Sequence, residues 1–326
     1  MKLELNFKSL TILFLLTCVT LIGISTALNA KPSNSDSPAA RSNPKCTENS
    51  GTLTRITDTT DCEITPDEQK ITFYRLDLCT SEPTGPTPSA IVDRTNCSTF
   101  YKNDNGSEVS IVKGTGTQIG SASDYTALPY GTYTHGIVTM GNEFKFKTVA
   151  TFSGTMGDGD STDSARCVTQ SSSLGTIYGD ENRINSSAKR NVICDDTQVA
   201  GETTVGVNTL TTLNTNCFHL ITFKARNIAI DTYLLEADGT LNDNVATSGA
   251  LIDRVTRNAA GCISGTNNGV SRVQGIMPMN LKITPETTGL QIRYNNTRGI
   301  MVDMSSANNE IFKWDSAFFD FELIAK

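Results

Sequence analysis

Apolar and polar residues alternate with a period of two over most of the chain beyond residue 60. In Phe144–Phe152 the apolar residues at 144, 146, 150 and 152 share one face, and Lys145 and Lys147 lie on the other. A strand with one buried face requires this arrangement. The same period predicts further strands at Ile71–Leu78, Val109–Val112, Tyr133–Met140, Phe218–Ala225, Ile228–Glu236, Leu290–Tyr294, Ile300–Met304 and a last strand with Phe319, Phe321 and Leu323 on its inner face.

Turn signals separate these segments. Asn105–Gly106 stands before the predicted strand Val109–Val112, and Asp238–Gly239 follows Ile228–Glu236. Both dipeptides are typical of hairpin turns. One helix is expected, at Ala246–Asn258. Many short strands between turns predict a mainly β fold with little helix, built as one or more antiparallel β-sandwiches. An open barrel is the alternative architecture.

Composition divides the chain into regions. Residues 31–45 are rich in Ser, Pro and Asn and predict a disordered linker, and residues 46–152 carry the clearest strands. Residues 153–216 are rich in Gly, Ser and Asp, and such a length favours a strand or short helix inside this connection. Residues 217–326 form a second β-rich region. The length allows one large or two ordinary domains.

The first 27 residues have the order of an export signal. Lys2 and Lys8 precede the apolar run Leu10–Ile24, which is shorter than the roughly 20 residues that a membrane-spanning helix needs. Small residues follow, so cleavage is expected after Ala27, with Ala30 as a second option. The mature protein is therefore expected to be secreted, extracellular or on the cell surface, and the periplasm is another possible destination.

An uncleaved anchor that extends to about Leu28 is the alternative. Lipid modification of Cys18 is disfavoured because the apolar run continues beyond that residue. No later segment is apolar over a length that would span a bilayer.

Cysteine usage indicates the same oxidising destination. Nine cysteines, less Cys18, leave eight in the mature chain, and an even number in an exported protein indicates disulfides. Zinc is disfavoured because the chain has no Cys-x-x-Cys pair and only two histidines. Eight cysteines allow 105 connectivities. Pairing of neighbours closes the shortest loops and predicts the bridges Cys46–Cys62, Cys79–Cys97, Cys167–Cys194 and Cys217–Cys262.

The charge balance argues against two classes of partner. Removing residues 1–27 takes away Lys2, Lys8 and Glu4, which changes the count from 27 basic and 34 acidic residues to 25 and 33. A net charge of −8 does not suit nucleic acid, whose phosphates need basic patches, or an anionic membrane surface.

Leu128-Pro129-Tyr130-Gly131-Thr132-Tyr133 is a turn leading into a strand. It resembles the L-P-x-G-x-Y motif of prealbumin-like, carbohydrate-binding-like β-sandwich domains of secreted surface proteins, and Phe73–Leu78 fits their opening strand. The resemblance covers about residues 70–152 and implies an adhesin-like surface role. Repeats of this kind that form a Lys–Asn crosslink carry Glu four residues after the Tyr. Ile137 stands there, so no crosslink is expected.

The two histidines give no catalytic pattern. His135 lies in a predicted strand and His219 lies close to Cys217, and neither has a nucleophile motif or a metal-binding His spacing beside it. The chain is therefore not expected to be an enzyme. A carboxylate pair leaves no sequence motif, so an enzyme of that kind ranks third among the functional hypotheses.

Two weaker sites are expected. Asp158, Asp160 and Asp163 offer oxygen ligands for Ca²⁺ among glycines, and a solvated acidic turn is the alternative interpretation of that segment. Trp314 and Tyr130 are candidate glycan contacts, although a lone Trp near a terminal strand is more often a core residue.

These observations favour a secreted or cell-surface structural or adhesin-like protein, with self-association as one mode of action. The alternative is an extracellular module that binds a glycan, a protein or another ligand, with calcium assisting.

Overall fold

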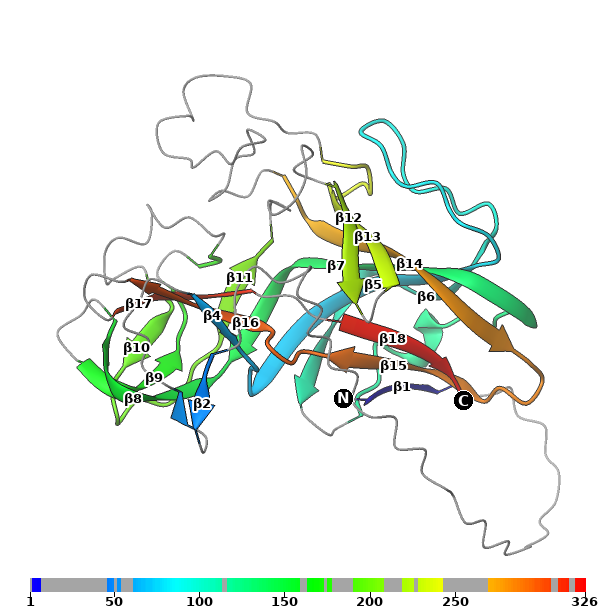
Figure 1. The fold of residues 1–326 in the computed structure, drawn as a ribbon. Coiled ribbons are helices and arrows are strands. Elements are labelled where there is room, and N and C mark those ends of the chain that lie inside the picture. Colours follow the sequence, from blue (N-terminus) through cyan, green and yellow to red (C-terminus); the bar gives the residue numbers. More distant parts are fainter. Residues whose placement is uncertain are drawn as a thin grey trace, which may run out of the picture.

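Strands account for most of the residues that the computed structural model describes (Figure 1). Within the described residues the only helical element is one 3-10 turn, η1 (Ala122–Asp124), and no helix there is long and apolar enough to cross a membrane. The expected mainly β, antiparallel fold class is confirmed. The structure describes residues 2–6, 46–49, 52–53, 61–112, 116–158, 163–172, 175–177, 190–207, 219–225, 228–242, 269–305, 310–316 and 320–326.

The first large sheet is built around one long strand, β7, which pairs with β5 along one edge and with β14 and β11 along the other. All of its pairings are antiparallel, in the order β12-β13-β14-β7-β5-β6. Its strands are β5 (Glu68–Cys79), β6 (Cys97–Val112), β7 (Gly131–Lys147), β11 (Thr203–Gly206), β12 (His219–Ala225), β13 (Ile228–Leu235) and β14 (Arg272–Ile283).

The second large sheet has the order β10-β9-β8-β17-β16-β4, with β3 paired to β8 and β2 to β3. Its pairings are antiparallel except for single parallel pairs of β8 with β17 and with β3. Its strands are β2 (Glu48–Asn49), β3 (Thr52–Leu53), β4 (Cys62–Ile64), β8 (Val149–Gly157), β9 (Asp163–Thr169), β10 (Val192–Cys194), β16 (Ile300–Ser305) and β17 (Glu310–Ser316).

A third, three-stranded sheet has β15 (Gly289–Asn295) between β1 (Lys2–Asn6) and β18 (Asp320–Ala325) (Figure 1). One hydrophobic core cluster contains buried side chains from all three sheets, among them Phe144, Trp314 and Leu290. The sheets therefore bury their apolar faces against a common interior, in a sandwich-like arrangement.

Strands from the two regions expected on either side of residues 153–216 share sheets. β14 pairs with β7, and β16 pairs with β4. The boundaries expected at residues 152 and 217 therefore do not separate the sheets. The connection itself contributes β9, β10 and β11, so the strands expected inside it are present.

Two local expectations are wrong. The Asn105–Gly106 dipeptide makes a bulge inside the single strand β6, where the register moves from Phe73 opposite Ser107 to Arg75 opposite Lys102. Gly106 has a φ of 76°, a left-handed conformation that glycine adopts without steric cost.

The second error concerns Phe144–Phe152, which spans the end of β7 and the start of β8 and is not one strand. Thr148 separates the two strands and donates its N–H to Thr169 Oγ1 at 3.0 Å. The expected burial of the apolar residues is nevertheless confirmed, since those at 144, 146, 150 and 152 are all buried. The helix expected at residues 246–258 lies outside the described residues. So do two residues of predicted strands, Phe218 and Phe319.

Three of the four expected disulfides are present: Cys46–Cys62, Cys79–Cys97 and Cys167–Cys194. Cys79 lies directly opposite Cys97 on β5 and β6, and Cys167 lies opposite Cys194 on β9 and β10. These two bridges therefore join neighbouring strands that backbone pairing already brings together. The fourth expected pair, Cys217–Cys262, lies outside the described residues.

The turn motif at residues 128–133 has a specific physical role. Tyr133 is buried at the start of β7, and its hydroxyl donates to the carbonyl of Pro129 at 2.8 Å. This bond fixes the direction in which the chain enters the strand, in the manner of the tyrosine corner of β-sandwiches. Tyr130, in the middle of the turn, is 70% exposed.

Replacing Tyr133 by Phe should lower the free energy of unfolding by about 1 kcal/mol, because the Pro129 carbonyl loses its buried donor while the ring stays in place. Tyr130→Phe is the matched control and should leave stability unchanged within about 0.5 kcal/mol. Urea denaturation of the two variants and the wild type measures both values. Equal stability of all three proteins would contradict the role given to Tyr133.

Candidate functional site

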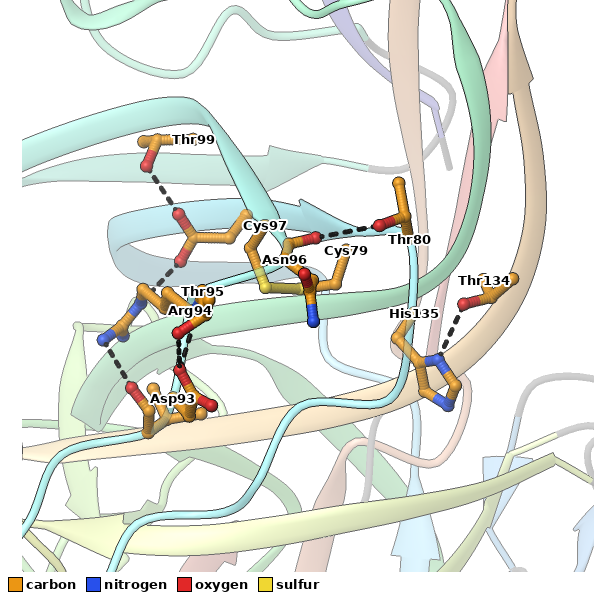
Figure 2. The surroundings of a disulfide bond; sticks show 12 residues. Cys79, Thr80, Asp93, Arg94, Thr95, Asn96, Cys97, Thr99, Thr134 and His135 are labelled. Carbon is orange, nitrogen blue, oxygen red and sulfur yellow. Dashed lines mark hydrogen bonds and ion pairs between the residues drawn. A yellow bond between two sulfur atoms is a disulfide. The ribbon is translucent and has the colours of Figure 1, made fainter.

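The loop between β5 and β6, residues 80–96, is held at its base, at its tip and along one side. The Cys79–Cys97 disulfide closes its base, and beside it the Thr80 hydroxyl donates to the Asn96 carbonyl at 3.3 Å (Figure 2). The Thr80 N–H donates to the same carbonyl at 3.0 Å. At its tip, Thr87 and Ala90 exchange backbone hydrogen bonds of 2.8 and 3.2 Å around Pro88. Proline is favoured at this position of a turn because its φ is preset.

The buried carboxylate of Asp77 attaches the loop to strand β5. Asp77, on β5, is fully buried and accepts hydrogen bonds from Arg75 Nε at 2.8 Å, Arg94 Nε at 2.9 Å and Thr99 Oγ1 at 2.7 Å. Arg94 belongs to the loop, and Figure 2 shows it close to the disulfide. A buried charge is tolerated only when it is paired and hydrogen-bonded. Asp77 and Arg94 therefore attach the loop to the core.

The loop also forms backbone hydrogen bonds with the turn that follows β13. Ile91 pairs with Thr240, and the N–H of Leu241 donates to the Thr87 carbonyl at 3.0 Å. Gly85 lies against the ring of Tyr233, whose hydroxyl is 2.3 Å from the place a Cβ would take. No other residue fits at position 85 unless that ring moves. Burial, followed by the nearby Asp231 and Glu82 carboxylates, raises the pKa of Tyr233 to about 12.

Two Asp-x-Thr turns border this surface, one in the loop and one in the neighbouring turn. Asp93 Oδ1 accepts the Thr95 hydroxyl at 2.6 Å and its N–H at 2.9 Å, and Asp238 has the same bonds to Thr240 at 2.7 and 2.9 Å. The threonine hydroxyls, then the backbone N–H groups, lower the pKa of both carboxyls. Both groups therefore stay ionised further into acid than an ordinary Asp.

The resulting surface is polar and acidic, and its one exposed large aliphatic residue is Ile91, at 53% exposure. We call it the braced loop surface: residues 80–96 together with Asp238–Thr240. Because its backbone is held by a disulfide, a buried ion network and a neighbouring turn, a partner would not need to order it on binding.

The structure places the three calcium candidates differently. Asp158 is buried, and its Oδ2 accepts the backbone N–H of Cys194 at 2.8 Å, so that carboxylate supports the β9–β10 region. Asp163 is exposed at the start of β9, and Asp160 lies outside the described residues. Among the residues that are described, no group of three or more His, Cys, Asp or Glu side chains is arranged to hold a metal ion.

Trp314 is not a glycan contact, contrary to the expectation. It is fully buried in β17, where its Nε1 donates to the Val168 carbonyl at 3.3 Å and its backbone N–H donates to Asn191 Oδ1 at 2.8 Å. A ring held inside the core cannot stack on a sugar. Tyr130 remains exposed, in the turn that precedes β7 of a different sheet.

The two histidines lie on separate strands of the first large sheet. His135 is on β7 opposite Cys79, and its Nδ1 is 3.0 Å from the hydroxyl of Thr134 (Figure 2). His219 begins β12.

Sequence reasoning missed a second buried charge cluster. Lys313, on β17, is 2% exposed, with its Nζ 2.7 Å from Asp315 Oδ2 and 3.5 Å from Asp303 Oδ2. Asp61 belongs to the same cluster. Burial raises its pKa, while a hydrogen bond from the Met304 N–H and the charge of Lys313 act in the opposite direction. Lys313 and Asp315 share one face of a strand, and that spacing was the only signal available in the sequence.

Comparison of the chain with protein-family models, with curated proteins and with solved structures finds no match. The functional conclusion therefore depends on the residues and their geometry.

Replacing Asp77 by Asn should lower the free energy of unfolding by about 3 kcal/mol, because two guanidinium groups lose their common buried counter-charge. Amide hydrogen exchange in residues 80–96 should accelerate, since Arg94 no longer attaches the loop. Asp104→Asn, which breaks an exposed pair with Lys102, is the control and should cost less than about 0.5 kcal/mol. An Asp77→Asn variant as stable as the control would show that the cluster does not brace the loop.

Proposed function

We propose that this protein is an exported, extracellular or cell-surface β-protein that acts by contact, as a structural or adhesin-like subunit. The observation that carries the proposal is the set of three disulfides. Cys46–Cys62 joins the segment before β2 to β4, Cys79–Cys97 joins β5 to β6, and Cys167–Cys194 joins β9 to β10. Disulfides of this kind form and persist in oxidising compartments. The basic, apolar and small-residue order of residues 1–27 supports the same destination.

The resemblance to prealbumin-like domains belongs to the same proposal. The Tyr133–Pro129 bond gives the L-P-x-G-x-Y segment a structural purpose, and β5 supplies the strand that fits the opening strand of such domains. Both features support an adhesin-like surface role.

Export is tested by producing the full chain in an export-competent host and measuring the intact mass of the released or surface-held protein. We expect the mass of a chain that begins after Ala27 or Ala30, lower by the hydrogens of all paired thiols, with no thiol reactive toward an alkylating reagent. A chain that lacks residues 1–27 is the control and should stay inside the cell with reduced cysteines. Free thiols and an intact N-terminus in the full-length product would contradict the proposal.

A second candidate function, recognition of a glycan or protein ligand, is favoured by the braced loop surface. Its backbone is held before any ligand arrives, and it presents Ile91 among hydroxyl and carboxylate groups. These are the features of a preformed binding surface.

The second candidate is tested on a glycan array with the exported protein. If the loop is the binding surface, Ile91→Asp should abolish the signal of any glycan that the wild type binds, because a charge replaces the exposed apolar contact. Val199→Asp is the matched control, since Val199 is 82% exposed and lies outside the loop. Equal loss in both variants, or full binding by Ile91→Asp, would contradict recognition by this surface.

A further inference from the structure

The N-terminal strand and the export signal are the same residues. β1 (Lys2–Asn6) pairs antiparallel with β15, with Leu3 opposite Ile292 and Leu5 opposite Leu290. In Figure 1, β1 forms the outer edge of the three-stranded sheet, and β15 lies between it and β18. This pairing requires residues 2–6 to be on the same side of the membrane as the folded domain.

Export separates β1 from β15 whether the signal is cleaved or is kept as a membrane anchor. Cleavage after Ala27 or Ala30 takes β1 away from the mature protein. If the apolar run is kept as an anchor, Lys2 and Lys8 stay on the cytoplasmic side, because positive charges flanking an apolar segment are retained there. The domain then lies on the opposite side from β1. In both cases β15 becomes an edge strand.

The backbone groups that this edge exposes follow from the pairing with β18. The N–H of Lys326 donates to the carbonyl of Gly289 at 3.0 Å, so the backbone of Gly289 faces β18. Neighbouring residues of a strand present their backbone groups to opposite edges. Leu290, Ile292 and Tyr294 therefore direct their N–H and C=O groups toward the position of β1. Their side chains are 0 to 2% exposed, so they belong to the core and hold the edge in place.

We propose that a second copy of this chain occupies the edge, through antiparallel pairing of β15 with the partner's β15 about a two-fold axis at Ile292. The inference rests on the proposed export. Ile292 is the middle residue of Gly289–Asn295, so a two-fold axis there pairs the whole strand. The residues that face the edge then meet one another: Ile292 is opposite the partner's Ile292, and Leu290 is opposite the partner's Tyr294. About six backbone hydrogen bonds would form.

Charge also favours this register. Arg293, which has Glu322 as an ion-pair partner at 3.6 Å, lies opposite the partner's Gln291 and not opposite another arginine. Shifting the axis by one residue toward the C-terminus would place the two arginines directly opposite, which is destabilising in a sheet.

The sequence that follows the signal does not repeat the pattern of β1. The segment that follows the signal, residues 31–45, has the sequence KPSNSDSPAARSNPK, with no alternating apolar residues to continue the pattern of Leu3 and Leu5. An unprotected edge with neither proline nor an inward-pointing charge is a template for another strand. The second copy supplies a strand that already has the required apolar alternation.

The first test uses the exported wild-type protein, after intact mass has shown that residues 2–6 are absent from it. Analytical ultracentrifugation should give a dimer at micromolar concentrations. With rising protein concentration, the amide hydrogens of Leu290, Ile292 and Tyr294 should become protected from exchange. Those of Gln291 and Arg293, bonded to β18 throughout, should not change, which makes them an internal control.

The second test fixes the register by crosslinking. Gln291→Cys and Arg293→Cys are made separately, each exported, and mixed under mild oxidation; directly opposite residues that are not hydrogen-bonded to each other lie about 4.5 Å apart and suit a disulfide. The mixture should form a crosslinked dimer, and either variant alone should form little. The dimer is overturned if the correctly processed protein stays monomeric. It is also overturned if the exchange rates of the Leu290, Ile292 and Tyr294 amides do not change with protein concentration. Crosslinking equal in the mixture and in the single variants overturns the register.

Failure of export is a separate result. It would appear as residues 1–27 retained in the folded product with reduced cysteines, and it would remove the proposed function before the dimer is measured.

Discussion

The pairing of β7 with strands on both of its edges is the constraint on which the fold depends. β5 ends about fifty residues before β7 begins, and β14 begins more than a hundred residues after β7 ends. Both run antiparallel to β7 over most of its length. Such long-range pairing costs loop-closure entropy, which burial of apolar side chains and backbone hydrogen bonding must offset. Ile137 and Val138, near the centre of β7, are 0 and 1% exposed. The part of β7 that pairs with both distant strands is therefore also fully buried.

The disulfides act on a different scale. They close segments of 16, 18 and 27 residues and so restrict the unfolded chain locally, at about 3 kcal/mol each. None of the three described bridges joins β7 to β14 or links two sheets through residues far apart in sequence. Covalent bracing therefore secures hairpins and the loop at residues 80–96, while the topology itself is held by the apolar interior and by backbone pairing.

Period-two patterning predicted strands such as β5, β13 and β15 because each encodes its own alternation. It could not predict which strands pair, since any apolar face fits any other to a first approximation. The division at residues 152 and 217 failed to describe the sheets for this reason. Neighbour pairing of cysteines succeeded three times because hairpins and loops bring nearby cysteines together.

Buried charge was the other part that the sequence did not reveal. Asp77 occupies a position that alternation assigns to a solvated face, and Lys313 lies on β17, which was not among the predicted strands; both side chains are buried. Trp314 shows the same effect in reverse, since a residue considered for recognition fills the core next to Lys313. Local pattern reports one face of a strand, whereas burial depends on what the rest of the chain places over the other face.

The three-stranded sheet brings these points together. None of the described disulfides touches it, so its stability comes from burial of Leu290, Ile292 and Tyr294 and from strand pairing alone. Without β1 it is reduced to β15 and β18, and two strands are marginal in water unless other elements support them. Joining two copies through β15 produces a four-stranded sheet with β18 of each copy at the outside. The residue pattern that makes β15 a good central strand is therefore the same pattern that makes it a poor edge.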